Sequence, residues 1–71
     1  MSDKKFLTDI GSRIKKIRQE KNITQIKLAA LCNFEKASMS RIESGKTNTT
    51  VLTLRKISQA LEVPMSDFFT D

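Results

Sequence analysis

Apolar residues recur at intervals of three and four along nearly the whole chain, which is the spacing of one face of an α-helix. The pattern begins at Leu7, Ile10 and Ile14, and it returns late in the chain at Val51 and Leu54. No stretch alternates polar and apolar residues for long enough to predict a β-strand. The sequence therefore predicts an all-α fold.

Capping and turn residues divide this pattern into five predicted helices. Asn33 and Gly45 suit the left-handed conformation that ends a helix, and Pro64 disfavours helix at the residue before it. Thr8 is a candidate N-cap for the first helix, and a start near Asp3 is the alternative. The predicted helices lie at approximately 8–21, 25–32, 36–44, 50–62 and 65–70.

The chain has 71 residues, which is enough for one domain, residues 1–71, and too few for two. Short helices joined by short connections predict a compact five-helix bundle. One of two adjacent phenylalanines near the C-terminus is expected in the core, and the other is a candidate for a contact across a dimer interface. The predicted core consists of Ile10, Ile14, Ile17, Leu28, Leu31, Met39, Ile42, Leu54, Ile57, Leu61 and one of Phe68 or Phe69.

Composition excludes several classes of function. The single Cys32 cannot form an internal disulfide, and a chain without histidine lacks the usual zinc ligands and a histidine general base. Clustered carboxylates and a glycine-rich phosphate loop are also missing, so we expect no enzyme, no catalytic residues, no metal and no cofactor. No apolar run approaches the roughly 20 residues that cross a bilayer, and no export signal is visible. We therefore expect a cytoplasmic protein in which Cys32 is a small core residue.

Positive charge is concentrated in the middle of the chain. The region from Arg13 to Lys56 contains eleven Lys or Arg and three Glu, a net charge of +8, whereas residues 57–71 contain three acids and no base. Such a concentration attracts a polyanion such as nucleic acid. The alternative is a solvated surface that happens to be basic.

The second and third predicted helices are joined by a very short connection, which predicts a helix-turn-helix. Ala29 places a small side chain where the two backbones approach, and Asn33 tolerates the positive φ of a tight turn. Met39 and Ile42 lie three residues apart and are expected to face the second helix.

The other face of the third helix is then exposed, and its side chains suit the major groove of DNA. Arg41 can donate two hydrogen bonds to guanine, and Lys36 can donate to a base or to a phosphate. The expected base contacts are Lys36, Ala37, Ser40 and Arg41. The expected phosphate contacts, at the start of the second helix and in the loop after the third, are Gln25, Ser44, Lys46, Thr47 and Asn48.

The stretches from Thr24 to Leu31 and from Ser40 to Lys46 resemble the phage repressor and Cro-like (Xre-like) helix-turn-helix family, and the resemblance extends over most of the chain. It implies a lambda-repressor-like five-helix domain with the helix-turn-helix at helices two and three. It also implies a homodimer that binds a two-fold site on double-stranded DNA, and it agrees with the base-reading positions given above. Finally, it implies a structural ion pair between Arg18 and Glu43.

Several residues depart from the family pattern. Lys27 stands where an acid is common, which removes a capping-box partner. Glu35 occupies the N-cap of the third helix, where its charge suits the helix dipole but repels nearby phosphates. Asn33 replaces the usual turn glycine. Glu62 replaces a helix-ending glycine, so Pro64 is expected to end the fourth helix instead.

The resemblance implies a sequence-specific transcriptional regulator, most simply a repressor or a protein like a restriction-modification controller. We expect no small-molecule ligand, because the chain has no room for a sensing domain. The alternative is an antitoxin-type module that uses the same fold to neutralise a protein partner and to regulate its own gene. A long extra segment would favour that alternative, and only a few residues follow Phe69.

Overall fold

The computed structural model describes residues 2–69, and within that part of the chain every regular element is helical. The predicted all-α fold is therefore confirmed. The elements are the helices α1 (Asp3–Glu20), α2 (Gln25–Leu31), α3 (Lys36–Glu43) and α4 (Val51–Leu61), followed by the 3₁₀ turn η1 (Met65–Phe68). None of the described helices is long and apolar enough to span a membrane.

The fifth predicted helix, at residues 65–70, is a single 3₁₀ turn instead, and residue 70 lies outside the described residues. The Asp67 amide donates to the Pro64 carbonyl at 3.1 Å, and the Phe69 amide donates to the Ser66 carbonyl at 3.1 Å. These bonds span three residues rather than four, which is the usual form of a short terminal turn.

The first helix begins at Asp3, earlier than the predicted start at residue 8. Ser2 is its N-cap, because the Ser2 hydroxyl oxygen accepts a hydrogen bond from the Lys5 amide at 3.1 Å. Thr8 is an interior residue whose hydroxyl donates to the Lys4 carbonyl at 2.9 Å. The alternative start near Asp3 is therefore the observed one.

Left-handed residues end the helices or follow them closely. Asn22 and Asn33 have φ values of 59° and 60°, and Gly45 has a φ of 74°. Glu62 also adopts this conformation, with a φ of 58°, and it is the C-cap of α4. The expectation that Pro64 ends this helix was therefore wrong, because the backbone already leaves the helix at Glu62 and the Val63 amide donates to the Ser58 carbonyl at 3.0 Å.

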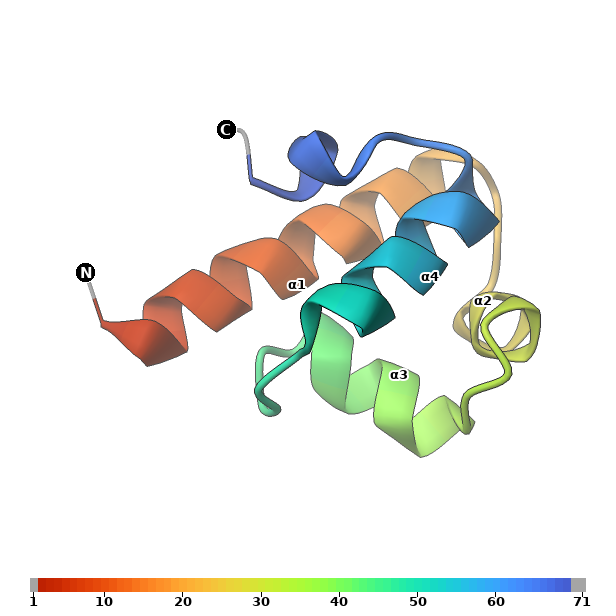
Figure 1. Ribbon diagram of the computed structural model, residues 1–71. Coiled ribbons are helices and arrows are strands. Elements are labelled where there is room, and N and C mark those ends of the chain that lie inside the picture. The colour runs from red at the N-terminus through yellow and green to blue at the C-terminus, as the bar shows by residue number, and fades with distance from the viewer. Residues whose placement is uncertain (1, 70–71) are drawn as a thin grey trace.

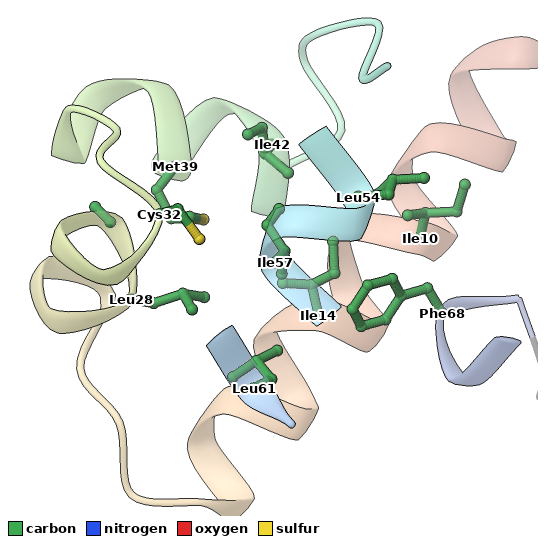
Figure 2. Close-up of a cluster of buried hydrophobic side chains, with 11 residues drawn as sticks. Ile10, Ile14, Leu28, Cys32, Met39, Ile42, Leu54, Ile57, Leu61 and Phe68 are labelled. Carbon is green, nitrogen blue, oxygen red and sulfur yellow. The ribbon is translucent and has the colours of Figure 1, made fainter. Parts of the chain in front are cut away.

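Figure 1 shows α1 running through the molecule with α3 on one side and η1 on the other, and α1 contacts both elements. The helix α2 contacts α3 and α4. Side chains from all five elements meet between them, as the close-up in Figure 2 shows. The buried apolar residues are Ile10, Ile14, Leu28, Ala29, Cys32, Met39, Ile42, Leu54, Ile57, Leu61 and Phe68.

Two residues of the predicted core lie elsewhere. Leu31 is 51% exposed, and Ile17 is only partly buried at the edge of the core. Leu28 and Ala29 are buried on α2, and so is Cys32, the C-cap that follows the helix. At 3.6 residues per turn, these three positions turn the buried face away from Leu31. Cys32 was correctly interpreted as a small core residue.

The two adjacent phenylalanines have different environments. Phe68 is buried, and Figure 2 shows its ring beside Ile10 and Ile14. Phe69 is exposed, and its ring stacks on Phe6 of α1 with 6.4 Å between the ring centroids. Phe68 is therefore the core member of the pair.

Candidate nucleic-acid interface

The third helix is anchored by its inner face and presents its outer face to solvent. Met39 and Ile42 are buried, as predicted, and they hold α3 against the core. The four residues expected to contact bases all lie on the exposed side of this helix or at its start. They are Lys36, Ala37, Ser40 and Arg41.

A tight turn fixes the position of α3 relative to α2. The Phe34 amide donates to the Ala29 carbonyl at 2.8 Å, and Asn33 takes the positive φ that the turn requires. Ala29 is buried where α2 approaches α3, so a small side chain is needed there. On the outer side of this turn, the Lys56 ammonium lies 5.7 Å from the centroid of the Phe34 ring. This last contact joins the turn to α4.

A second close approach joins α3 to α1 at Gly11. A Cβ atom added at Gly11 would collide with the backbone carbonyl groups of Ile42 and Glu43, so only glycine allows this distance between the helices. Sequence reasoning did not identify Gly11. A glycine inside a helical pattern lowers helix propensity by about 1 kcal/mol relative to alanine, and that cost is the signal that indicates a packing role.

Arg18 and Glu43 form a buried ion pair between α1 and the last residue of α3. The guanidinium donates from Nε to Glu43 Oε2 at 2.7 Å and from Nη2 to Oε1 at 3.0 Å. Arg18 Nη1 also donates to the Ile23 carbonyl at 2.9 Å. The carboxylate is therefore neutralised locally, and the pair fixes the end of α3.

Gln25 extends this network to the start of α2. Its Nε2 donates to Glu43 Oε1 at 3.1 Å, so the amide is held in one orientation. Thr24 caps the same helix by accepting from the Lys27 amide at 3.0 Å, which shows that Lys27 does not prevent the cap. At the start of α3, by contrast, the Glu35 side chain makes no capping hydrogen bond.

The loop after α3 contains the other residues expected to contact phosphate. Lys46 and Asn48 are exposed, and Thr47 is partly buried. The Ser44 hydroxyl donates to the Ser40 carbonyl at 2.9 Å, or alternatively to the Arg41 carbonyl at 3.2 Å. The Ser44 proton is therefore already used by backbone, and this hydroxyl is a weaker donor than the sequence suggested.

A shallow hollow of about 130 Å³ lies where α1, α2 and α3 meet, and we call it the interhelix hollow. Gln25, Ser40 and Ser44, three of the expected DNA contacts, lie at this hollow. From the sequence, Lys15 is either a phosphate contact or an ordinary solvated lysine on a helix, and it was therefore not among the expected contacts. The residues that line the hollow are Lys15, Gln25, Ser40, Glu43 and Ser44.

Cys32 is a free, buried cysteine. Burial raises the pKa of the Cys32 thiol above its ordinary value, although the nearby charge of Lys56 acts in the opposite direction. The thiol is therefore protonated and unreactive near neutral pH. Within residues 2–69, no three His, Cys, Asp or Glu side chains gather as metal ligands.

Comparisons with known proteins match this geometry. The family model described as "Helix-turn-helix" (HTH_3) matches residues 14–68. Control protein C.MunI of Mycoplasma sp is 37% identical over 86% of this chain and 84% of its own length, and Antitoxin HipB of Escherichia coli K12 is 36% identical over 83% and 67%. The crystal structure of the restriction-modification controller protein C.AhdI from Aeromonas hydrophila superposes with a TM-score of 0.86 at 25% identity, covering 89% of this chain and 96% of that one.

Proposed function

The chain belongs to the helix-turn-helix family of DNA-binding transcriptional regulators, and we propose that it binds a two-fold operator as a homodimer, with α3 in the major groove. The observation that carries this proposal is the outer face of α3, which is polar, cationic and exposed on a helix whose inner face is buried. The major groove of B-DNA admits one α-helix, and its base edges can be read from such a face.

Four side chains of α3 are proposed to contact bases. Arg41 donates two hydrogen bonds to the O6 and N7 atoms of a guanine, and Lys36 donates to a base or to a neighbouring phosphate. The Ser40 hydroxyl donates or accepts, and the Ala37 methyl group contacts a thymine methyl.

Residues on both sides of α3 are proposed to bind the DNA backbone. Gln25 lies at the start of α2, and Ser44, Lys46, Thr47 and Asn48 follow at the end of α3. Backbone contacts of this kind fix the register of the recognition helix and contribute affinity without reading sequence.

A homodimer is proposed because one short helix reads only a few base pairs. Two copies of α3 separated by about 34 Å enter successive major grooves on one side of the duplex. Leu52 is strongly exposed at the start of α4, beside the exposed Val51, and apolar surface of this kind is available for a contact between protomers.

Selection of duplexes from a random pool tests the proposal directly. The expected result is a two-fold sequence motif whose half-sites are about one helical turn apart. Equal affinity for selected and random duplexes would overturn it, because that result would leave only the salt-dependent attraction of a basic protein for DNA.

Two biological roles are compatible with this binding mode. The match to C.MunI, which spans most of both chains, favours a controller or repressor that acts through DNA alone in the cytoplasm. The match to HipB favours an antitoxin-type module as the second candidate. Operator binding by the purified chain distinguishes the two roles, because a regulator of the first kind requires no protein partner for tight binding. Operator binding that appears only with a co-purified partner favours the second.

A further inference from the structure

We propose that Glu35 reads the 4-amino group of a cytosine in the major groove, beside the bases contacted by Lys36 and Ala37. This inference rests on the proposed function, and it adds an acidic residue that is not among the expected base contacts. A carboxylate accepts a hydrogen bond from the cytosine amino group, which is the donor that this base presents in the groove. Glu35 therefore contributes to specificity and not to general affinity for DNA.

The backbone of Glu35 is held in place at the start of α3. Glu35 is the N-cap of this helix, with an extended conformation (φ −74°, ψ 151°), and its carbonyl accepts a hydrogen bond from the Met39 amide at 3.1 Å. The preceding residue, Phe34, is anchored to α2 by the bond from its amide to the Ala29 carbonyl. In helix-turn-helix proteins, the N-terminal residues of the recognition helix contact base edges. The Glu35 side chain therefore starts from a fixed point next to Lys36, at the end of α3 that reads bases.

The Glu35 carboxylate is exposed and is not held by the protein itself. It forms no capping hydrogen bond, and it takes no part in the ion pairs Lys5–Asp9 and Arg18–Glu43. Within residues 2–69, no other side chain donates a hydrogen bond to it. Both of its oxygens are therefore available to accept a hydrogen bond from a base.

Cytosine suits a carboxylate better than the other bases do. Adenine also presents an amino group in the major groove, but its N7 acceptor lies beside that donor and repels a carboxylate, and guanine and thymine present acceptors. The phosphates of the duplex also repel the charge of Glu35, so this residue weakens binding wherever no amino group compensates for the repulsion. An unpaired charge of this kind rejects wrong partners, which favourable contacts alone do not do.

The helix dipole gives Glu35 a structural role that the experiment separates from base reading. A negative charge at the N-terminus of α3 stabilises the helix, and its removal would affect binding to every duplex by the same factor. Loss of a base contact instead changes the order of preference among sequences. The decisive measurement is therefore base preference at each position and not overall affinity.

Duplex selection with full-length variants measures that preference. We expect the wild type to prefer cytosine about tenfold at one position of each half-site. Glu35→Ala should lose this preference and keep the others. Glu35→Gln should also lose it, with adenine as the expected replacement, because glutamine makes a two-pronged contact with adenine. Glu20→Gln is the control, since it removes the same charge from an exposed residue at the end of α1 that the proposal does not assign to DNA.

A cytosine analogue without the 4-amino group, pyrimidin-2-one, then tests the hydrogen bond itself. Placed at that position of the selected duplex, it should weaken binding of the wild type about tenfold more than binding of Glu35→Ala, which has already lost the contact. Three results would each overturn the role of Glu35 while leaving the proposed function intact: a cytosine preference retained by either Glu35 variant, a Glu35-dependent position that favours another base, or equal losses with the analogue. A wild-type protein that does not prefer the selected duplex would instead overturn the proposed function.

Discussion

Arg18 and Glu43 are 25 residues apart in the sequence and form a two-pronged ion pair between α1 and α3, with their side chains only 9% and 3% exposed. The same carboxylate orients Gln25 at the start of α2. The Glu43 carboxylate therefore connects α1 to both helices of the helix-turn-helix.

Arg18→Met should strongly destabilise the protein, because Glu43 would remain buried without its partner. The expected loss of unfolding free energy is about 3–5 kcal/mol at neutral pH, measured by urea denaturation. The double variant Arg18→Met/Glu43→Leu serves as the control and should recover most of this loss, since no buried charge is left unpaired. If the double variant were no more stable than the single one, the loss would come from packing and not from the charge.

Gly11→Ala should also destabilise the protein, even though alanine favours helix more than glycine does. The added methyl group would collide with backbone carbonyl groups of α3, which cannot move as a side chain can. We expect a net loss of about 1–3 kcal/mol, as for other overpacked sites. Ser12→Ala, at the next and exposed position of the same helix, should have little effect. Equal stabilities for the two variants would show that α1 and α3 do not approach closely at Gly11.

Ionisation of the buried Cys32 thiol should lower the free energy of unfolding at alkaline pH. Burial raises its pKa in the folded protein above the ordinary value of 9.0. The stabilisation from the neutral thiol is therefore complete below that value and is lost as the pH rises through the folded pKa. We expect the difference in unfolding free energy between wild type and Cys32→Ala to be smaller at pH 10 than at pH 7. An unchanged difference would show that Cys32 does not contribute to this pH dependence.

Local signals in the sequence predict much of the fold. The residue types that end helices are visible at Asn33 and Gly45, and both adopt positive φ in the structure. Apolar spacing identifies the inner face of α3 through Met39 and Ile42, and both are buried.

Features that depend on contacts between distant segments were not predicted. Leu31 fits the apolar pattern of α2, but whether it is buried depends on where α4 packs, and the smaller Cys32 takes the inner position. Glu62 adopts a left-handed conformation, because the chain turns there toward η1. This conformation costs a residue with a side chain about 1–2 kcal/mol. Lys15 lines the interhelix hollow together with residues of α2 and α3, and the local pattern of α1 does not show that the three helices meet there.

Lys46→Ala should weaken binding to all duplexes by a similar factor. Lys46 is exposed in the loop after α3, and a proposed phosphate contact there carries no sequence information. The expected change is a decrease of about one unit in the slope of log affinity against log salt, with an unchanged order of preference among sequences. Lys21→Ala provides the control, since Lys21 is an exposed lysine at the end of α1 that the proposal does not assign to DNA. Identical slopes for wild type and Lys46→Ala would remove the loop from the interface.

Arg41→Ala should change specificity as well as affinity. Arg41 is exposed on α3, one residue before the buried Ile42, and its guanidinium suits the two acceptors of a guanine in the major groove. We expect a loss of about 1–3 kcal/mol in binding to the selected duplex and a relaxed preference at one base pair of each half-site. The measurement compares wild type and variant on the selected duplex and on duplexes with each base pair changed in turn. A uniform loss across all of these duplexes would reassign Arg41 to a phosphate, and an unchanged affinity would place it outside the DNA interface.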